Sequence, residues 1–225
     1  MRYCFPALAF LLMSVAAIGF YASDSYNIVE HLPLKVIERN GNIYCVDNDG
    51  KEISITSAGV DSAPSLSADQ KLVTFVRENS KVMSEDVFMM LPSTEIWKAP
   101  TDGSEAPCIV VRHDHPLTGE STILRNFGRP VFSNDSSEIY FSISCWATSA
   151  ALYSVNISDS STKFVTDGNS LEIVRSGNWA DHIITQKHKY FVGGGSYDWY
   201  WLVSPDGETV GPLGENTDYF KKNCL

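Results

Sequence analysis

Basic residues are scarce in this sequence, and their scarcity excludes two classes of partner. Lysine and arginine number 17 against 27 aspartates and glutamates, which gives a formal net charge of −10 at pH 7. Because an acidic surface repels phosphate groups, we expect neither nucleic acid nor an anionic membrane surface as the partner. The same surface would favour a basic protein partner, but acidity is also simply a way for a protein to stay soluble, which is the simpler interpretation.

Cysteines are few and lie far apart, with none of the spacings that define common cysteine motifs. No two of them form a redox CxxC pair or the paired ligands of a zinc ribbon. Cys4 belongs to the N-terminal apolar segment, which leaves Cys45, Cys108, Cys145 and Cys224. In an oxidising compartment these four permit three full pairings. We expect no disulfide or one, and favour Cys224 as a member because a chain end gains most from being tied down.

Catalytic and phosphate-binding motifs are incomplete. The glycines before Ser196 approach the nucleophile elbow of serine hydrolases, but Asp198 stands where that motif requires glycine. The same glycines lack the spacing of a phosphate-binding loop. The turn-like residues 47–50 lack the later glutamate of an EF-hand calcium loop. We therefore expect a protein without enzymatic activity and without a cofactor.

His113 and His115 are the best candidates for a metal site. Residues two apart on a strand point to the same face, so these two imidazoles can chelate one ion. A zinc site needs three or four ligands, and the third must come from elsewhere, such as His182 or His188. A metal-dependent enzyme using His113 and His115 remains an alternative, and a polar loop ending at Pro116 is the simpler interpretation.

The N-terminus carries an apolar run that is typical of an export signal. Arg2 is followed by an uncharged and almost wholly apolar stretch, Phe5 to Ala22, with small residues near its end. We expect residues 1–22 to be a signal peptide and residues 23–225 to form one domain in the periplasm or outside the cell. The alternative is an uncleaved anchor, since the run just reaches the length that spans a bilayer.

Two segments of the chain repeat each other at a fixed offset. Residues 63–76 read APSLSADQKLVTFV, and residues 129–142 read RPVFSNDSSEIYFS. Each consists of an apolar pair, a Ser-x-Asp corner and a strand-like stretch. In such a corner the side chains bond to nearby backbone amides, which predicts a tight turn. The matching pairs are Pro64 and Pro130, Leu66 and Phe132, Ser67 and Ser133, Asp69 and Asp135, and Phe75 and Phe141.

A second unit places an aromatic residue at a fixed interval before an Asp-Gly pair. It occurs at residues 43–51, 96–103 and 200–208, with a weaker copy at 152–160. The aromatic and β-branched residues suit a strand, and Asp-Gly supplies the positive φ of a hairpin corner. A period of about 50 residues with strand-like content is typical of propeller blades. The aromatics, which we expect to fill the core, are Tyr44, Trp97 and Trp201.

The two units together resemble TolB-type β-propeller repeats, which are related to WD-type repeats. The resemblance covers residues 42–160 and 199–212. TolB-type propellers usually resemble six-bladed rings with an extra N-terminal domain, whereas this chain has room for about four blades. The expected fold is all-β, a small β-propeller of about four four-stranded blades, with no helix beyond the N-terminal segment. Such a fold presents loops on two faces, which suits recognition of a partner.

The sequence YDWYW at residues 197–201 is the strongest candidate for a binding surface. Alternation sends Tyr197, Trp199 and Trp201 to one face of a strand and Tyr200 to the other. Since tyrosine and tryptophan are enriched at binding hot spots, we expect Tyr197, Trp199 and Tyr200 to contact the partner. Acidic residues in the insertions 78–94 and 113–129 are expected to steer a basic partner; these are Glu85, Asp86, Asp114 and Glu120.

The sequence as a whole predicts an exported monomer that binds a protein or peptide, with membrane contact only through an uncleaved N-terminal segment. One further alternative remains open. In it the protein binds a cell-wall glycan, and the aromatic residues of YDWYW serve as stacking platforms for sugar rings.

Overall fold

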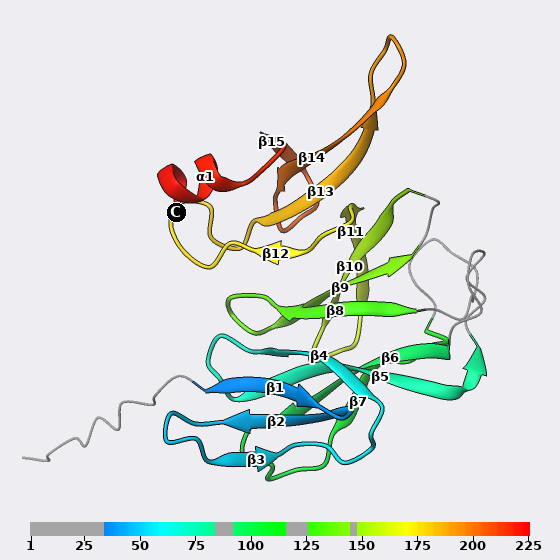
Figure 1. Ribbon diagram of the computed structural model, residues 1–225, viewed down its shortest axis with the longest axis vertical. Coiled ribbons are helices and arrows are strands. Elements are labelled where there is room, and N and C mark those ends of the chain that lie inside the picture. The colour runs from blue at the N-terminus through cyan, green and yellow to red at the C-terminus, as the bar shows by residue number, and fades with distance from the viewer. Residues whose placement is uncertain (1–33, 84–91, 116–125, 145–147) are drawn as a thin grey trace, which may run out of the picture. The chain divides into compact units, whose positions relative to one another are not determined.

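Strands are the main regular structure of the described chain (Figure 1). The computed structural model describes residues 34–83, 92–115, 126–144 and 148–225. Its strands form four antiparallel sheets, and within each sheet they follow one another in chain order. This order requires only short turns, because antiparallel neighbours can be joined by tight hairpins.

The strands have the following bounds. The first sheet contains β1 (Lys35–Arg39), β2 (Asn42–Val46) and β3 (Glu52–Ser54). The second contains β4 (Asp61–Leu66), β5 (Leu72–Met83), β6 (Pro92–Pro100) and β7 (Cys108–Val111). The third contains β8 (Phe127–Phe132), β9 (Glu138–Ser144), β10 (Ala150–Asn156) and β11 (Thr162–Asp167). The fourth contains β12 (Glu172–Ile173), β13 (Ile183–Tyr190), β14 (Ser196–Val203) and β15 (Thr209–Gly214).

The succession of four meandering sheets is the small all-β propeller that the repeats predict. The aromatic unit falls on β2, β6, β10 and β14, so these strands are equivalent between the sheets. β4, β8 and β12 are the first strands of their sheets, and the first sheet has no described strand equivalent to them. It therefore has three described strands, whereas the other three blades have the four strands expected.

The core lies in layers between successive sheets, because neighbouring residues of one strand face opposite ways. Phe75 packs in one layer with Ile43 of the first sheet. Val76, the next residue, packs in another layer with Phe141 of the third sheet. Tyr140 in turn belongs to the layer shared with the fourth sheet. The second and third sheets are therefore buried on both faces.

The aromatics of the second unit are less buried than the sequence predicts. Tyr44 and Trp97 are half-buried, and the residue before Trp97, Ile96, is the fully buried one. An arginine lies over each aromatic ring: the guanidinium of Arg39 is 4.5 Å from the ring centroid of Tyr44, and that of Arg77 is 4.3 Å from that of Trp97. The prediction thus missed the register by one residue. On β6 the reason is that a strand buried on both faces gives no alternation to read.

The Ser-x-Asp corners form the predicted turns in both copies. The hydroxyl of Ser67 donates to Asp69 Oδ1 at 2.7 Å, and that of Ser133 donates to Asp135 Oδ1 at the same distance. Each carboxylate also accepts a backbone N–H two residues further on. The turn residue after each aspartate has positive φ, 59° at Gln70 and 61° in the second copy. The repeat therefore extends from side-chain hydrogen bonds to backbone conformation.

The Asp-Gly corners also take the predicted conformation. Gly50, Gly103 and Gly207 have φ values of 77°, 68° and 91°. Ser160, which replaces glycine in the weaker copy, has φ of 60°. At Gly207 a side chain is also excluded by space, since an added Cβ would lie 2.2 Å from the carbonyl oxygen of Val165.

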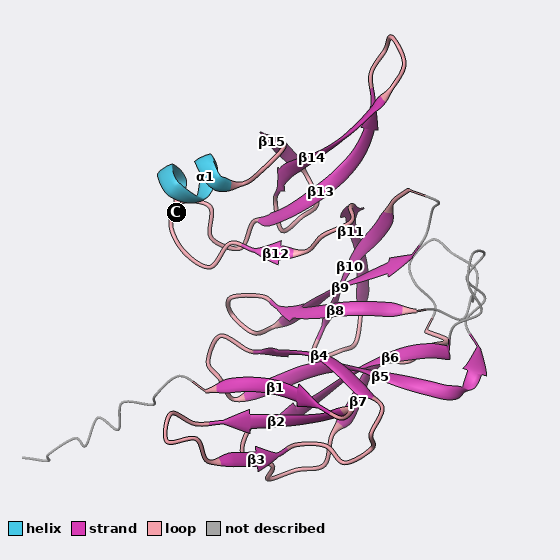
Figure 2. Cartoon of the chain, in the orientation of Figure 1, coloured by secondary structure: helices cyan, strands magenta, loops and turns pink. Residues whose placement is uncertain are grey.

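One short helix, α1 (Asp218–Cys224), lies at the C-terminus of the described chain (Figure 2). The expectation of no helix beyond the N-terminal segment was therefore wrong. The helix buries one side chain, Phe220, against a cluster of the fourth sheet that includes Leu202. Lys221 adds an ion pair with Glu172 at 2.8 Å. A single buried residue in one helical turn is too weak a pattern to read from sequence.

The described cysteines, Cys45, Cys108 and Cys224, are all free. Cys224 forms no disulfide. Packing of Phe220 holds the end of the chain instead. Cys45 is fully buried in the layer between the first two sheets, and burial raises the pKa of its thiol to about 11. Cys145 lies outside the described residues.

Replacing an aromatic residue in the layers between the sheets with alanine should destabilise the fold far more than replacing an aromatic residue that an arginine covers. Phe141 is fully buried and meets Phe127 edge-on at 5.3 Å. We expect Phe141→Ala to lower the free energy of unfolding by about 3–5 kcal/mol. Tyr44→Ala should cost clearly less, since the Tyr44 ring is half-exposed. Urea denaturation measures both, and equal losses would contradict the assignment of the layers.

The Ser-x-Asp turns should give the fold an acid-sensitive component. Hydrogen bonds from Ser133 and then Ser137 hold the pKa of Asp135 below its ordinary value. Because the folded pKa lies below the unfolded one, this stabilisation is present above about pH 4 and is lost as pH falls through the folded pKa.

We expect Asp135→Ala to cost less than about 1 kcal/mol at pH 7, since the carboxylate is exposed, and less still at pH 2. Asp135→Asn keeps an acceptor without a titrating proton, so its stability should respond less to pH than that of the parent. Thermal melts at both pH values measure this, and a pH-independent cost of the alanine variant would argue against the turn's role.

Candidate functional site

The β13–β14 hairpin reaches past the other two strands of its sheet (Figure 1). Its strands pair without interruption from Ile183 and Val203 to Tyr190 and Ser196. By contrast, β12 pairs with β13 only at the first two residues of β13, and β15 pairs with β14 only from Tyr200 onward. The outer part, residues 187–199, is a two-stranded ribbon, which we call the overhang.

One face of the overhang carries a row of aromatic rings. The ring centroids of Tyr197 and Trp199 are 4.9 Å apart, and those of Phe191 and Tyr197 are 4.7 Å apart. The rings are tilted by 55° and 41° respectively, so they pack on one another along the strand. We call Phe191, Tyr197 and Trp199 the aromatic ladder. It places two of the predicted binding residues side by side on the predicted face.

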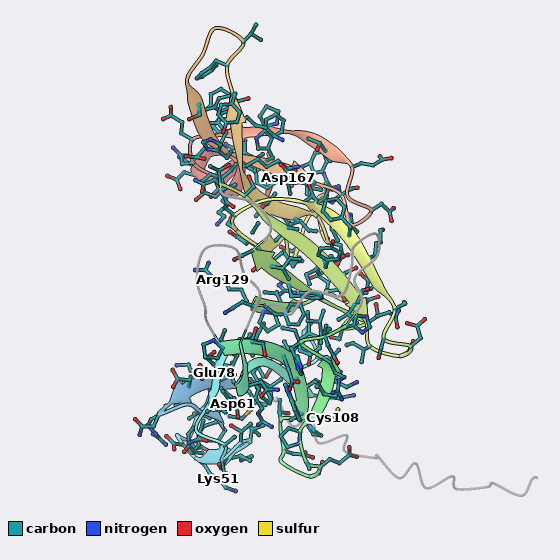
Figure 3. All side chains as sticks on the ribbon, turned by 90° about the vertical axis from the view of Figure 1, so that its right-hand side faces the viewer. Lys51, Asp61, Glu78, Cys108, Arg129 and Asp167 are labelled. Atoms are coloured by element: carbon teal, nitrogen blue, oxygen red, sulfur yellow. The ribbon has the colours of Figure 1, made fainter. Side chains whose placement is uncertain are left out.

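The ladder face is fixed to the neighbouring sheet by two lysines. Lys187 and Lys189 lie opposite Trp199 and Tyr197 in the strand register. The ammonium of Lys187 donates to Asp167 Oδ1 at 2.9 Å, and that of Lys189 donates to Asp167 Oδ2 at 3.0 Å. Asp167, labelled in Figure 3, ends β11 of the third sheet. One carboxylate therefore holds the overhang through both lysines.

The carboxylate of Asp167 and the buried ammonium of Lys187 each have partners that compensate for their loss of contact with water. Burial raises the pKa of Asp167, but hydrogen bonds and charges of the two lysines outweigh it and hold that pKa below its ordinary value. The side chain of Lys187 is only 4% exposed, and it also donates to the hydroxyl of Thr166 at 2.6 Å. A buried ammonium requires such partners, because desolvation of an unpaired charge is costly.

The opposite face of the overhang is more polar. His188 Nδ1 lies 2.7 Å from Asp198 Oδ1, and its ring meets that of Tyr190 edge-on at 5.0 Å. Tyr200 lies on this face as well, but at its base, where it packs against a core cluster that contains Ile184 and Phe220. The predicted binding residue Tyr200 thus supports the fourth sheet, and its contact with a partner stays a prediction.

The tip of the hairpin exposes three apolar side chains that the sequence reasoning missed. Tyr190, Phe191 and Val192 are 70%, 53% and 110% exposed. They precede three glycines, two of which, Gly194 and Gly195, have positive φ. The signal was present as an apolar triplet beside a glycine turn, since a turn leaves its flanking side chains outside a core.

A second cluster surrounds the predicted metal ligand His113. Its Nδ1 lies 2.8 Å from Glu95 Oε1, and the indole N–H of Trp97 donates to Glu95 Oε2 at 3.1 Å. Arg77, next to Glu95 in the strand register, forms two hydrogen bonds of 2.6 and 2.8 Å to the buried Asp61. The cluster thus forms a row of hydrogen-bonded polar side chains across the second sheet.

The other residues that the sequence predicts as metal ligands or acidic binding residues are His115, Asp114, Glu85, Asp86 and Glu120. In residues 34–83, 92–115, 126–144 and 148–225, no group of three or more His, Cys, Asp and Glu side chains is arranged to hold a metal ion. The backbone N–H of His115 donates to the carbonyl of Arg112 at 3.0 Å. Asp114 pairs with Arg112 at 3.2 Å, which lowers its pKa. Glu85, Asp86 and Glu120 lie outside the described residues, as does the segment 1–22.

Within the described part of the chain, no helix has the length and apolar character that a membrane span requires.

Comparisons with known proteins concern the fold. No protein-family model matches the chain, and no curated protein matches its sequence. Dipeptidyl peptidase 4 of Porphyromonas gingivalis is 14% identical, with a TM-score of 0.49 over 82% of this chain and 31% of its own. A TolB protein of Agrobacterium tumefaciens is 15% identical, with a TM-score of 0.35 over 80% and 77%. The β-propeller domain of the trilobed protease of Pyrococcus furiosus is 13% identical, with a TM-score of 0.49 over 81% and 53%.

This chain therefore spans about a third of the peptidase and about half of the trilobed-protease chain. The similar structures include TolB proteins and a β-propeller domain. At these identities and TM-scores the likeness carries no conclusion about activity.

Removal of the Asp167 charge should loosen the overhang without unfolding the sheets. Asp167→Asn leaves two lysines without their counter-charge, one of them buried. Hydrogen bonds to charged groups contribute about 1.5–3 kcal/mol, so we expect amides of residues 187–190 to exchange at least about tenfold faster. Hydrogen exchange with mass spectrometry measures this.

The matched control is Asp206→Asn, which removes an exposed ion pair between Lys163 and Asp206 at 3.0 Å. Exposed pairs contribute little, so this variant should exchange like the parent. If Asp167→Asn also behaved like the parent, the two lysines would not hold the overhang.

Proposed function

We propose that this protein is an exported, non-enzymatic β-propeller module that binds a protein or peptide partner through the overhang. The observation that carries the proposal is the combination of an aromatic ladder with an exposed apolar tip on a ribbon that extends beyond its sheet. Repeated positions build the scaffold, whereas residues 190–199 lie outside the repeated units of the sequence.

Physical reasons favour a macromolecular partner for this surface. Contiguous exposed apolar side chains on a soluble protein mark interaction surfaces. Tyrosine and tryptophan supply large contact areas at a low cost in conformational entropy, which is why they dominate hot spots. The chain's net charge of −10 favours a basic partner and faster association at low salt. Tyr197 and Trp199 would supply the apolar contact, and Asp114 and the other predicted acidic residues would steer the partner.

The compartment follows from the N-terminal sequence. Residues 1–22 act as a signal peptide that directs the domain formed by residues 23–225 to the periplasm or the exterior. The basic residue, apolar run and small residues of this segment support the proposal. The domain functions as a monomer, because its net charge disfavours association with a second copy.

Some of the structurally similar proteins are peptidases or hydrolases by name, so a serine-hydrolase site is the enzymatic alternative to weigh. Ser196, His188 and Asp198 lie on the same face of the overhang. His188 contacts Asp198 and the ring of Tyr190, and within the described residues it has no hydrogen bond with Ser196. A hydrolytic triad requires that serine–histidine contact, so this arrangement supports a binding role.

A photoreactive amino acid at the tip should capture the partner. With a benzophenone side chain in place of Val192, we expect irradiation of cells of the source organism to yield discrete protein adducts. Phe191→Ala combined with Tyr197→Ala in the same chain should reduce adduct yield at least about tenfold, given hot-spot costs of about 2 kcal/mol or more. Gel mobility and mass spectrometry of the adducts measure this.

The control places the same photoreactive group at Tyr219 on α1, which is 78% exposed and outside the overhang. If both positions gave similar adducts, the cross-links would result from random collisions, and the overhang would not be a specific binding site. Adducts with glycan or lipid alone would contradict a protein or peptide partner.

A further inference from the structure

The outer strands of the four sheets are protected against pairing with another chain. A free strand edge presents unpaired N–H and C=O groups, and proteins blunt such edges with short strands, charges or proline. Here β3, β7 and β12 are short, β1 and β11 carry Lys35 and Lys163, and β4, β8 and β15 contain Pro64, Pro130 and Pro212.

The edge of β14 in the overhang, residues 196–199, is as short as β7, but it carries no proline or lysine and only one charge. β15 stops pairing at Tyr200, where a register shift and the positive φ of Gly214 (100°) end the hydrogen bonding between the two strands. Beyond that point β13 is the one described strand that pairs with β14. The one charge, Asp198, is engaged by His188 and is still 54% exposed.

The opposite edge of the same ribbon is occupied at its base. The carbonyl of Gln186 accepts the backbone N–H of Asn169 at 2.8 Å, and the N–H of Gln186 donates to Ser170 Oγ at 2.8 Å. The lysines that follow on β13 reach Asp167 from the ladder face. The side chains of Tyr197, Asp198 and Trp199 all belong to β14, so a strand added at the β14 edge meets them directly.

From the open β14 edge and the side chains beside it we infer that the partner binds by strand addition: an extended peptide pairs with the β14 edge at residues 196–199. Alternate side chains of an added strand face opposite ways, so one set meets Tyr197 and Trp199 and the other set meets Asp198. The fitting peptide has apolar residues at every second position and lysine or arginine between them. The inference rests on the proposed function and names the partner's chemistry and binding mode.

A second copy of this chain fits the edge less well than such a peptide. Two copies bring together two chains of net charge −10. A symmetric antiparallel pairing centred on Asp198 also sets one Asp198 directly against the other, which is unfavourable. A basic peptide meets the same carboxylate with an opposite charge.

The first experiment uses a short synthetic peptide of alternating valine and lysine and the full domain. We expect binding measurable by calorimetry, together with slower hydrogen exchange at the amides of residues 196–199. Two further peptides are N-methylated, one at every valine amide and one at every lysine amide, so that each lacks the donors of one edge. We expect one of these two to bind at least about tenfold more weakly than the parent peptide.

One control keeps the composition of the peptide and changes the order of its residues. The other reverses the charge at position 198 of the protein. A peptide with all valines followed by all lysines lacks alternation and should bind at least about tenfold more weakly. Asp198→Lys should reverse the preference, so that a valine–glutamate peptide binds better than the valine–lysine one. Thermal melts establish that the variant is folded.

Three results would overturn strand addition: no binding of the parent peptide at millimolar concentration, equal binding of all N-methylated forms, or protection only on β13. An unchanged preference for lysine in Asp198→Lys would overturn the basic character of the partner. These results would leave the cross-linking at Val192 unaffected. Only the absence of protein adducts at Val192 would contradict the proposed binding role.

Discussion

The structure depends on one constraint: each sheet must bury its apolar side chains against the next sheet. The second and third sheets meet this constraint on both faces, through layers that contain Phe75, Phe141 and Tyr140. The fourth sheet has a described neighbour sheet on one side only, and α1 covers part of its other face through Phe220. The helix is thus a consequence of ending a stack of sheets, since an apolar face needs a cover.

The same constraint explains why the overhang differs from the rest of the chain. Its aromatic ladder lies beyond the strands that flank the base of the hairpin, and Tyr197 and Trp199 are half-buried. A two-stranded ribbon is marginal in water unless something else holds it. Here the Asp167 carboxylate supplies that support from the third sheet, through the two lysines of the ladder face.

Sequence reasoning recovered those features that local chemistry determines. Asp69 and Asp135 form turns because their carboxylates bond to backbone groups two residues away, and the alternation of Tyr197 and Trp199 follows from strand geometry. It missed features that depend on distant segments. Tyr200 packs against α1 residue Phe220, and the overhang exists because β12 and β15 end where they do. No local pattern contains that information, although an apolar triplet beside three glycines indicated an exposed tip.

Burial of Cys45 gives the chain a thiol that is chemically silent. Thiolates attack disulfides and oxidants, and a thiol with a pKa of about 11 is almost entirely protonated at neutral pH. The side chain is also fully covered by the layer between the first two sheets. A folded chain can therefore carry this cysteine reduced through an oxidising compartment without a pairing partner, and only a chain that has opened its first layer exposes it to exchange.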